Sequence, residues 1–130
     1  MTTVHIGLGK CASSSLQKYV FPELEKLNKN IEFNNKVLKS LALKNLVEPL
    51  SYSERKEFKE IINNGKNHFI SHESLISWNT AYIEEFADLN LELFGKEVNI
   101  IIIIRDPLSY YTSIYQQVIQ EGNIISPSDF

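Results

Sequence analysis

The chain has 130 residues, of which 43% are hydrophobic, 11% aromatic and 22% charged, the composition of an ordinary globular protein. This length accommodates one domain or part of one. Thirteen Lys and Arg against sixteen Asp and Glu give a formal net charge of −3, which excludes a broadly cationic nucleic-acid-binding surface. The single cysteine excludes an internal disulfide, Cys and His show no zinc spacing, and no apolar run reaches the roughly 20 residues that a bilayer requires. We therefore expect a cytoplasmic protein without a transmembrane segment.

Three short apolar runs predict strands over residues 4–8, 68–71 and 98–104. Their β-branched residues lack polar alternation, which is typical of strands that are buried on both faces in a parallel sheet. The last run contains five consecutive isoleucines, and we expect it to form a central strand.

Amphipathic patterns predict helices between and after these strands. They cover residues 14–27, 53–63, 79–94 and 108–119, with a weaker pattern over 36–46. The alternation predicts an α/β fold, a parallel sheet flanked by helices in a three-layer sandwich. Three strands make a small sheet with two open edges, so we expect residues 1–130 to be the N-terminal part of one longer domain, incomplete at its C-terminus. Such a sheet would expose apolar surface that something must cover, and a homo-oligomer is one way to cover it.

The first predicted strand runs into a turn of small and hydroxyl residues. The turn consists of Gly9, Lys10, Cys11, Ala12, Ser13, Ser14 and Ser15. Backbone N–H groups at a helix start, a lysine ammonium and serine hydroxyls together favour a phosphate-like or sulfate-like anion. The turn is not a Walker A loop, because Cys11 follows Gly9-Lys10 and the earlier glycine is missing. The alternative is a serine-rich helix cap beside a lysine that is exposed by chance.

A second turn follows the isoleucine run. Arg105 stands where the strand should end, Pro107 is suited to the first turn of a helix, and Ser113 lies eight residues after Arg105. Ligands in open α/β sheets bind beyond the carboxyl ends of the strands, so we expect Arg105 to face the same region as Lys10. A guanidinium and a hydroxyl make a second anion site. The alternative is a local salt bridge between Arg105 and Asp106.

The second predicted strand also ends in polar residues. His72 and Glu73 follow it at the same edge of the sheet, and either side chain could abstract a proton. The alternative for Glu73 is a carboxylate favoured by the start of a helix. His5 and His68 are interpreted as strand residues without a partner.

The two anion turns together resemble those of the sulfotransferases that use 3′-phosphoadenosine 5′-phosphosulfate (PAPS). Residues 9–16 resemble that family's 5′-phosphosulfate-binding loop, whose pattern is close to Pro-Lys-x-Gly-[Ser/Thr]-[Ser/Thr]-[Ser/Thr]-Leu. Residues 102–107, followed by Ser113 and Tyr115, resemble its 3′-phosphate-binding segment. The resemblance spans most of the chain, but Gly9 and Ala12 replace the usual proline and glycine. The family's later glycine- and basic-rich loop has no counterpart before residue 130.

The resemblance implies a P-loop-like α/β fold and the transfer of a sulfuryl group from PAPS to a hydroxyl or amine of a small molecule or glycan, without a metal ion. In this resemblance, Lys10 and the amides of residues 11–15 stabilise the leaving phosphate, and the hydroxyls of Ser13, Ser14 and Ser15 hold the 5′-phosphate. Arg105 and Ser113 hold the 3′-phosphate. The stretch from Ser71 to Ser74 resembles the Ser-x-Glu of bacterial-type members, which favours Glu73 as general base, with His72 second. Two alternatives remain, a nucleotide-binding phosphotransferase of the P-loop kinase type and a non-catalytic, truncated sulfotransferase-like module.

Overall fold

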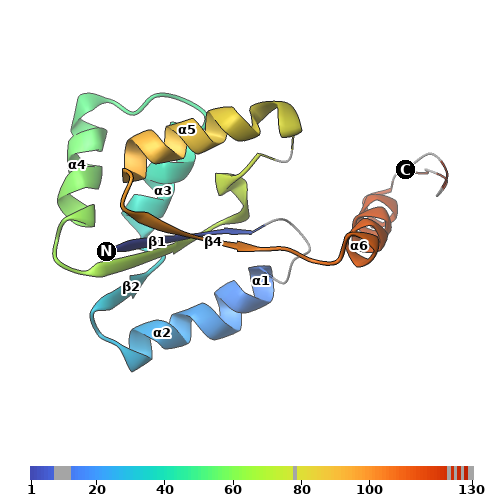
Figure 1. The fold of residues 1–130 in the computed structure, drawn as a ribbon, viewed down its shortest axis with the longest axis horizontal. Helices are drawn as coiled ribbons and strands as arrows, with labels where there is room; N and C mark the ends of the chain where they lie inside the picture. Colours follow the sequence, from blue (N-terminus) through green and yellow to red (C-terminus); the bar gives the residue numbers. More distant parts are fainter. Residues whose placement is uncertain (8–12, 78, 123, 125, 127, 129–130) are drawn as a thin grey trace.

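The protein is described here by a computed structural model, which covers residues 1–7, 13–77, 79–122, 124, 126 and 128. Its centre is a four-stranded, all-parallel sheet with the strand order β2-β3-β1-β4 (Figure 1). The strands are β1 (Thr2–Gly7), β2 (Ile31–Phe33), β3 (Asn67–Ser71) and β4 (Val98–Ile103).

Helices connect the strands and cover both faces of the sheet (Figure 1). After β1 the chain forms α1 (Ser13–Ser15), the π-helix η1 (Leu16–Val20) and α2 (Phe21–Leu27). After β2 it forms α3 (Lys36–Asn45) and α4 (Tyr52–Ile62). After β3 it forms two 3₁₀ turns, η2 (Glu73–Leu75) and η3 (Thr80–Tyr82), and then α5 (Ile83–Phe94). The last helix is α6 (Pro107–Gln120).

The predicted α/β fold with a parallel sheet between helices is confirmed. Within the described residues, however, the isoleucine strand β4 lies at an edge of the sheet, so its expected central position is wrong. Because no described strand pairs with its outer side, its side chains are largely exposed to solvent, with Ile100 57% and Ile102 53% exposed. A run of apolar residues indicates that both faces of a strand are apolar, but it does not reveal how many strands pair with it.

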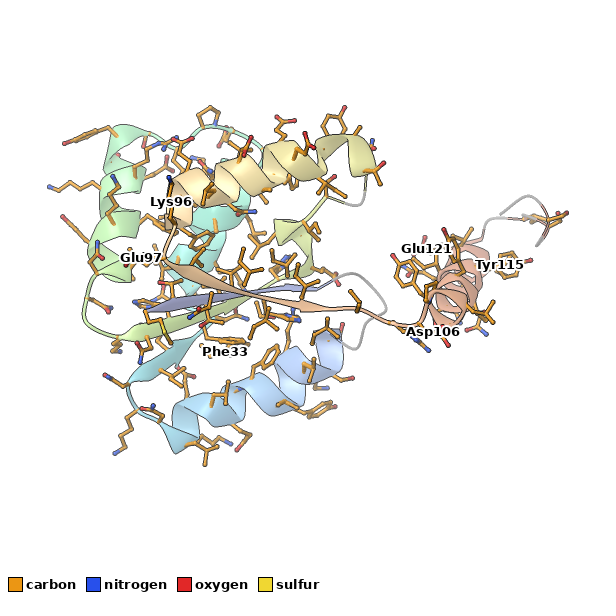
Figure 2. The ribbon with its side chains drawn as sticks, viewed as in Figure 1. Phe33, Lys96, Glu97, Asp106, Tyr115 and Glu121 are labelled. Carbon is orange, nitrogen blue, oxygen red and sulfur yellow. The ribbon has the colours of Figure 1, made fainter. Side chains whose placement is uncertain are left out.

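Two separate clusters of side chains hold the layers together. On the face toward α3, α4 and α5, Val4 and Ile70 from the sheet pack with Leu38 and Phe58, and each of the four is less than 4% exposed. On the opposite face, the cluster consists of aromatic rings from the sheet and α2, namely Phe21, Phe69 and Phe33. Figure 2 labels Phe33 between the sheet and α2. Each cluster removes several large apolar side chains from water, the main stabilising contribution in a fold of this size.

Local signals explain where three helices begin. The side chain of Asn35 accepts hydrogen bonds at the start of α3, and Ser51 with Glu54 forms a complete capping box at the start of α4. Asp106 caps α6 and Pro107 occupies its first turn, as the sequence indicates. Figure 1 shows α6 standing away from the sheet, beyond the end of β4. None of the helices in the described ranges combines the length and apolar character that a membrane span requires.

Candidate functional site

The carboxyl ends of the strands lie at one edge of the sheet. In the parallel register, His5 of β1 pairs with Ser71 of β3, and Gly7 of β1 pairs with Ile103 of β4. The turns that leave β1, β3 and β4 therefore emerge at the same edge, where open α/β sheets bind their ligands. These are the three turns in which the sequence predicts functional residues.

The turn after β1 is described only in part. Gly9, Lys10, Cys11 and Ala12 lie outside the described residues. That Lys10 faces the same region as Arg105 therefore stays a prediction. The structure places Ser13 in the first turn of α1, followed by Ser14 and Ser15, whose side chains are exposed. The α1 helix starts at the carboxyl end of the sheet (Figure 1).

The turn after β4 brings two predicted residues together. Nη1 of Arg105 donates a hydrogen bond to Oγ of Ser113 at 2.9 Å. The geometry follows from the sequence, because Ser113 lies in the second turn of the helix that begins at Pro107, within reach of the long Arg105 side chain. The guanidinium and the hydroxyl thus form one polar group beside the carboxyl end of the sheet.

Asp106 belongs to the helix rather than to this polar group. Its Oδ2 accepts the backbone N–H of Ser109 at 2.9 Å, at the start of α6 (Figure 2). That hydrogen bond, together with the Ser109 hydroxyl and the nearby charge of Arg105, holds the pKa of the Asp106 carboxyl below its ordinary value. Because Asp106 is a charged helix cap, its carboxylate is turned toward helix N–H groups.

The turn after β3 carries the two candidate bases. The backbone N–H of His72 donates to the carbonyl of His5, which holds this turn against β1. Burial lowers the pKa of His72, and the positive charge of Lys39 lowers it further, against an opposing effect of Glu73. His72 is therefore neutral near pH 7.

The hydrogen bonds of this turn separate the two candidates. Nδ1 of His72 accepts the backbone N–H of Ser74 at 3.1 Å, so the ring proton of the neutral imidazole belongs on Nε2. In that tautomer His72 has no lone pair left for a substrate proton. Glu73, in contrast, is exposed at the first position of η2. The geometry thus favours Glu73 as a base, which is the order that the sequence resemblance gives.

Sequence reasoning missed the hydrogen-bond partners of two buried histidines, of which His5 lies next to these turns and His68 lies at the other end of β3. His5 was expected to lack a partner, but its Nδ1 lies 2.7 Å from Oγ of Ser71. His68 was expected to lack one as well, but its Nε2 lies 2.9 Å from the carbonyl oxygen of Ile61. Both expectations are wrong, because the partners lie on elements whose packing the sequence does not reveal. The only available signal was a polar residue within each apolar strand.

Comparisons of the chain with protein-family models, with curated proteins and with solved structures find no match. Among the described residues, no group of three or more His, Cys, Asp or Glu side chains is arranged to hold a metal ion.

Proposed function

We propose that the chain is a PAPS-dependent sulfotransferase, or the donor-binding part of one. The observation that carries the proposal is the hydrogen bond between Arg105 and Ser113 at the carboxyl edge of the sheet. In the resemblance drawn from the sequence, these two residues share one ligand, the 3′-phosphate of the donor. A guanidinium and a hydroxyl within hydrogen-bonding distance of each other can contact neighbouring oxygens of one phosphate.

The chemistry of the residues fits this donor. A phosphate needs hydrogen-bond donors and positive charge, which Arg105 and Ser113 supply. The nearest carboxylate in sequence, that of Asp106, is bonded to the start of α6. PAPS, when bound, supplies an activated sulfuryl group on a phosphate leaving group. The residues of the chain then have to position the reactants and stabilise charge, much as in phosphoryl transfer.

In the proposed mechanism each turn has its own task. Arg105 and Ser113 fix the donor by its 3′-phosphate. Lys10 and the backbone amides before α1 neutralise the charge that develops on the leaving phosphate, while the hydroxyls of the serines in α1 hold its oxygens. Glu73 accepts the proton of the attacking hydroxyl or amine.

The proposal is tested with adenosine 3′,5′-bisphosphate (PAP), the product that remains after sulfuryl transfer. At a concentration of about 100 times its Kd, PAP should raise the melting temperature of a chain of this size by about 10 °C. Arg105→Ala and Lys10→Ala should each abolish the shift. Arg55→Ala is the matched control, because Arg55 lies in α4, bonds to Glu92 of α5 and belongs to none of these turns.

Three results would contradict the proposal. A melting temperature that ignores PAP but rises with Mg²⁺-ATP would favour a phosphotransferase. A shift that survives Arg105→Ala would place the nucleotide elsewhere. PAP binding without sulfuryl transfer to a panel of phenols, sugars and amines, in this chain and in a longer reading frame where one exists, would favour a non-catalytic module.

A further inference from the structure

A chain of buried and partly buried hydrogen bonds joins η1, which follows the serines of α1, to the end of β3 and the turn after it. Its centre is Ser71, the last residue of β3, which is 1% exposed. Oγ of Ser71 lies 2.7 Å from Nδ1 of His5 and accepts a hydrogen bond from Nε2 of Gln17 at 3.0 Å. The backbone N–H of Ser71 donates to Oδ1 of Asn34 at 2.8 Å.

The direction of these bonds follows from counting donors and acceptors. Nε2 of Gln17 can only donate, so the hydroxyl of Ser71 is free to donate its own hydrogen bond to Nδ1 of His5. This order, from Gln17 through Ser71 to His5, uses both a lone pair and the proton of the Ser71 hydroxyl and leaves Nε2 of His5 buried, with no partner among the described residues. The opposite order would leave the Ser71 proton unpaired as well. Bonds that run in one direction polarise and strengthen one another.

The backbone around Asn34 adds a second sign of a specified geometry. Asn34 has a φ of 49°, in the left-handed region that non-glycine residues rarely adopt. In this conformation its N–H donates to the carbonyl of Phe69 while its side chain reaches Ser71. The end of β3 is thus fixed through both its backbone and its side chain.

The elements joined in this way are those that the proposed function requires. Gln17 lies in the π-helix η1, directly after the serines of α1. Ser71 directly precedes His72 and Glu73. A π-helical stretch is rare and is frequently found at functional sites.

We propose that Ser71 and Gln17 are positioning residues, which set the serine turn before η1 against the Glu73 turn after β3. The catalytic consequence rests on the proposed sulfotransferase function. Neither residue touches the reactants; both act through the two turns that they connect. The surroundings support this role, because the ring of Phe21 lies 5.0 Å from that of His5 and 4.8 Å from that of Phe69. In such an apolar environment a hydrophobic side chain in place of Ser71 or His5 would need no hydrogen-bond partner, so stability alone does not require polar residues there.

The first test is independent of activity. Hydrogen–deuterium exchange is measured on the 130-residue chain, with Ser71→Ala and Gln17→Ala, and with Lys18→Ala as the exposed control in the same π-helix. Loss of one hydrogen bond should speed exchange about fivefold both in η1 and at Ser74 and Leu75. Gln17→Ala removes its bond from the helix side alone, so it remains informative if Ser71→Ala folds poorly. Faster exchange on only one side, or equally throughout the chain, would overturn the proposal.

The second test uses steady-state sulfuryl transfer from PAPS. Ser71→Ala and Gln17→Ala should lower kcat between about tenfold and a hundredfold while the KM for PAPS changes less than twofold, because a misplaced base slows the chemical step. Ser71→Thr, which keeps the hydroxyl, should restore most of the rate. Unchanged kcat in both alanine variants would overturn the positioning role and leave the proposed function standing. A wild-type chain that neither binds PAP nor transfers sulfuryl groups would refute the proposed function, and the exchange experiment would then decide the coupling by itself.

Discussion

The pair formed by Arg105 and Ser113 allows a sharp prediction about ligand selectivity. Oγ of Ser113 lies 2.9 Å from Nη1 of Arg105, so one phosphate can reach both groups. A hydrogen bond to a charged group contributes about 1.5–3 kcal/mol. Ser113→Ala should therefore weaken PAP binding roughly 10- to 150-fold.

The assay compares two nucleotides by titration calorimetry. Adenosine 5′-phosphate lacks the 3′-phosphate, so its Kd should change less than threefold in Ser113→Ala while the Kd of PAP rises. Arg105→Ala should weaken PAP binding at least as much. The double variant should lose less than the sum of the two single losses, with a coupling of about 0.5–3 kcal/mol, because both groups act on one phosphate.

Thr112→Ala is the matched control on the same helix. Oγ1 of Thr112 donates to the carbonyl of Leu108, so this hydroxyl serves the helix and should leave both affinities unchanged. Equal weakening of both nucleotides in Ser113→Ala would show that the serine acts on α6 as a whole. No weakening of either would remove Ser113 from the site, and additive losses in the double variant would separate it from Arg105.

Two further predictions concern stability against pH. Burial lowers the pKa of His5, so below the ordinary histidine value of 6.5 the unfolded chain binds more protons than the folded one, and stability falls as the pH drops, by at most about 1.4 kcal/mol per pH unit for this group. His5→Asn, which keeps an acceptor for Ser71, should flatten this slope in urea unfolding between pH 7.5 and 5, and an unchanged slope would contradict the assignment. Hydrogen bonds from Lys44 and Ser51 lower the pKa of Glu54 from 4.5 to about 2, so its contribution is present above pH 4.5 and is lost as the pH falls toward 2. Glu54→Gln should make thermal stability less dependent on pH in that window, and a full acid transition in this variant would assign the loss to other carboxylates.

The fold could be predicted wherever the signal is local. Hydrophobic periodicity gives α3 to α6 within a few residues, and the apolar runs give β1, β3 and β4. The helix expected over residues 14–27 is divided in the structure into α1, η1 and α2. The short strand β2 was missed, because three residues with Glu32 in the middle become a strand only by pairing with β3. Long-range pairing decides such an element, and one sequence does not contain it.

The candidate site divides in the same way. The approach of Arg105 to Ser113 was predictable, because both residues lie within one strand-to-helix segment and six of the seven residues between them belong to α6. The bonds of Ser71 to His5 and Gln17 were not, because these residues are 66 and 54 positions apart in the chain. The register between β1 and β3 brings His5 to Ser71, and the position of η1 against the end of β3 brings Gln17.

The distribution of charge among the three turns relates the charged residues of the site to the neutral residues around Ser71. An anionic sulfuryl donor and a neutral acceptor place opposite demands on one site. The sulfuryl donor needs positive charge and N–H or O–H groups around it, while the acceptor needs a base whose negative charge must not repel the sulfuryl donor. In the proposed mechanism the demands are met by separate turns, with Arg105 on one and Glu73 on another. Separate turns have to be held in register by something that does not itself carry charge into the site. A neutral, largely buried chain of hydrogen bonds through Ser71 does this for two of the turns, the serine turn before η1 and the Glu73 turn after β3, and it adds no group that would compete for either reactant.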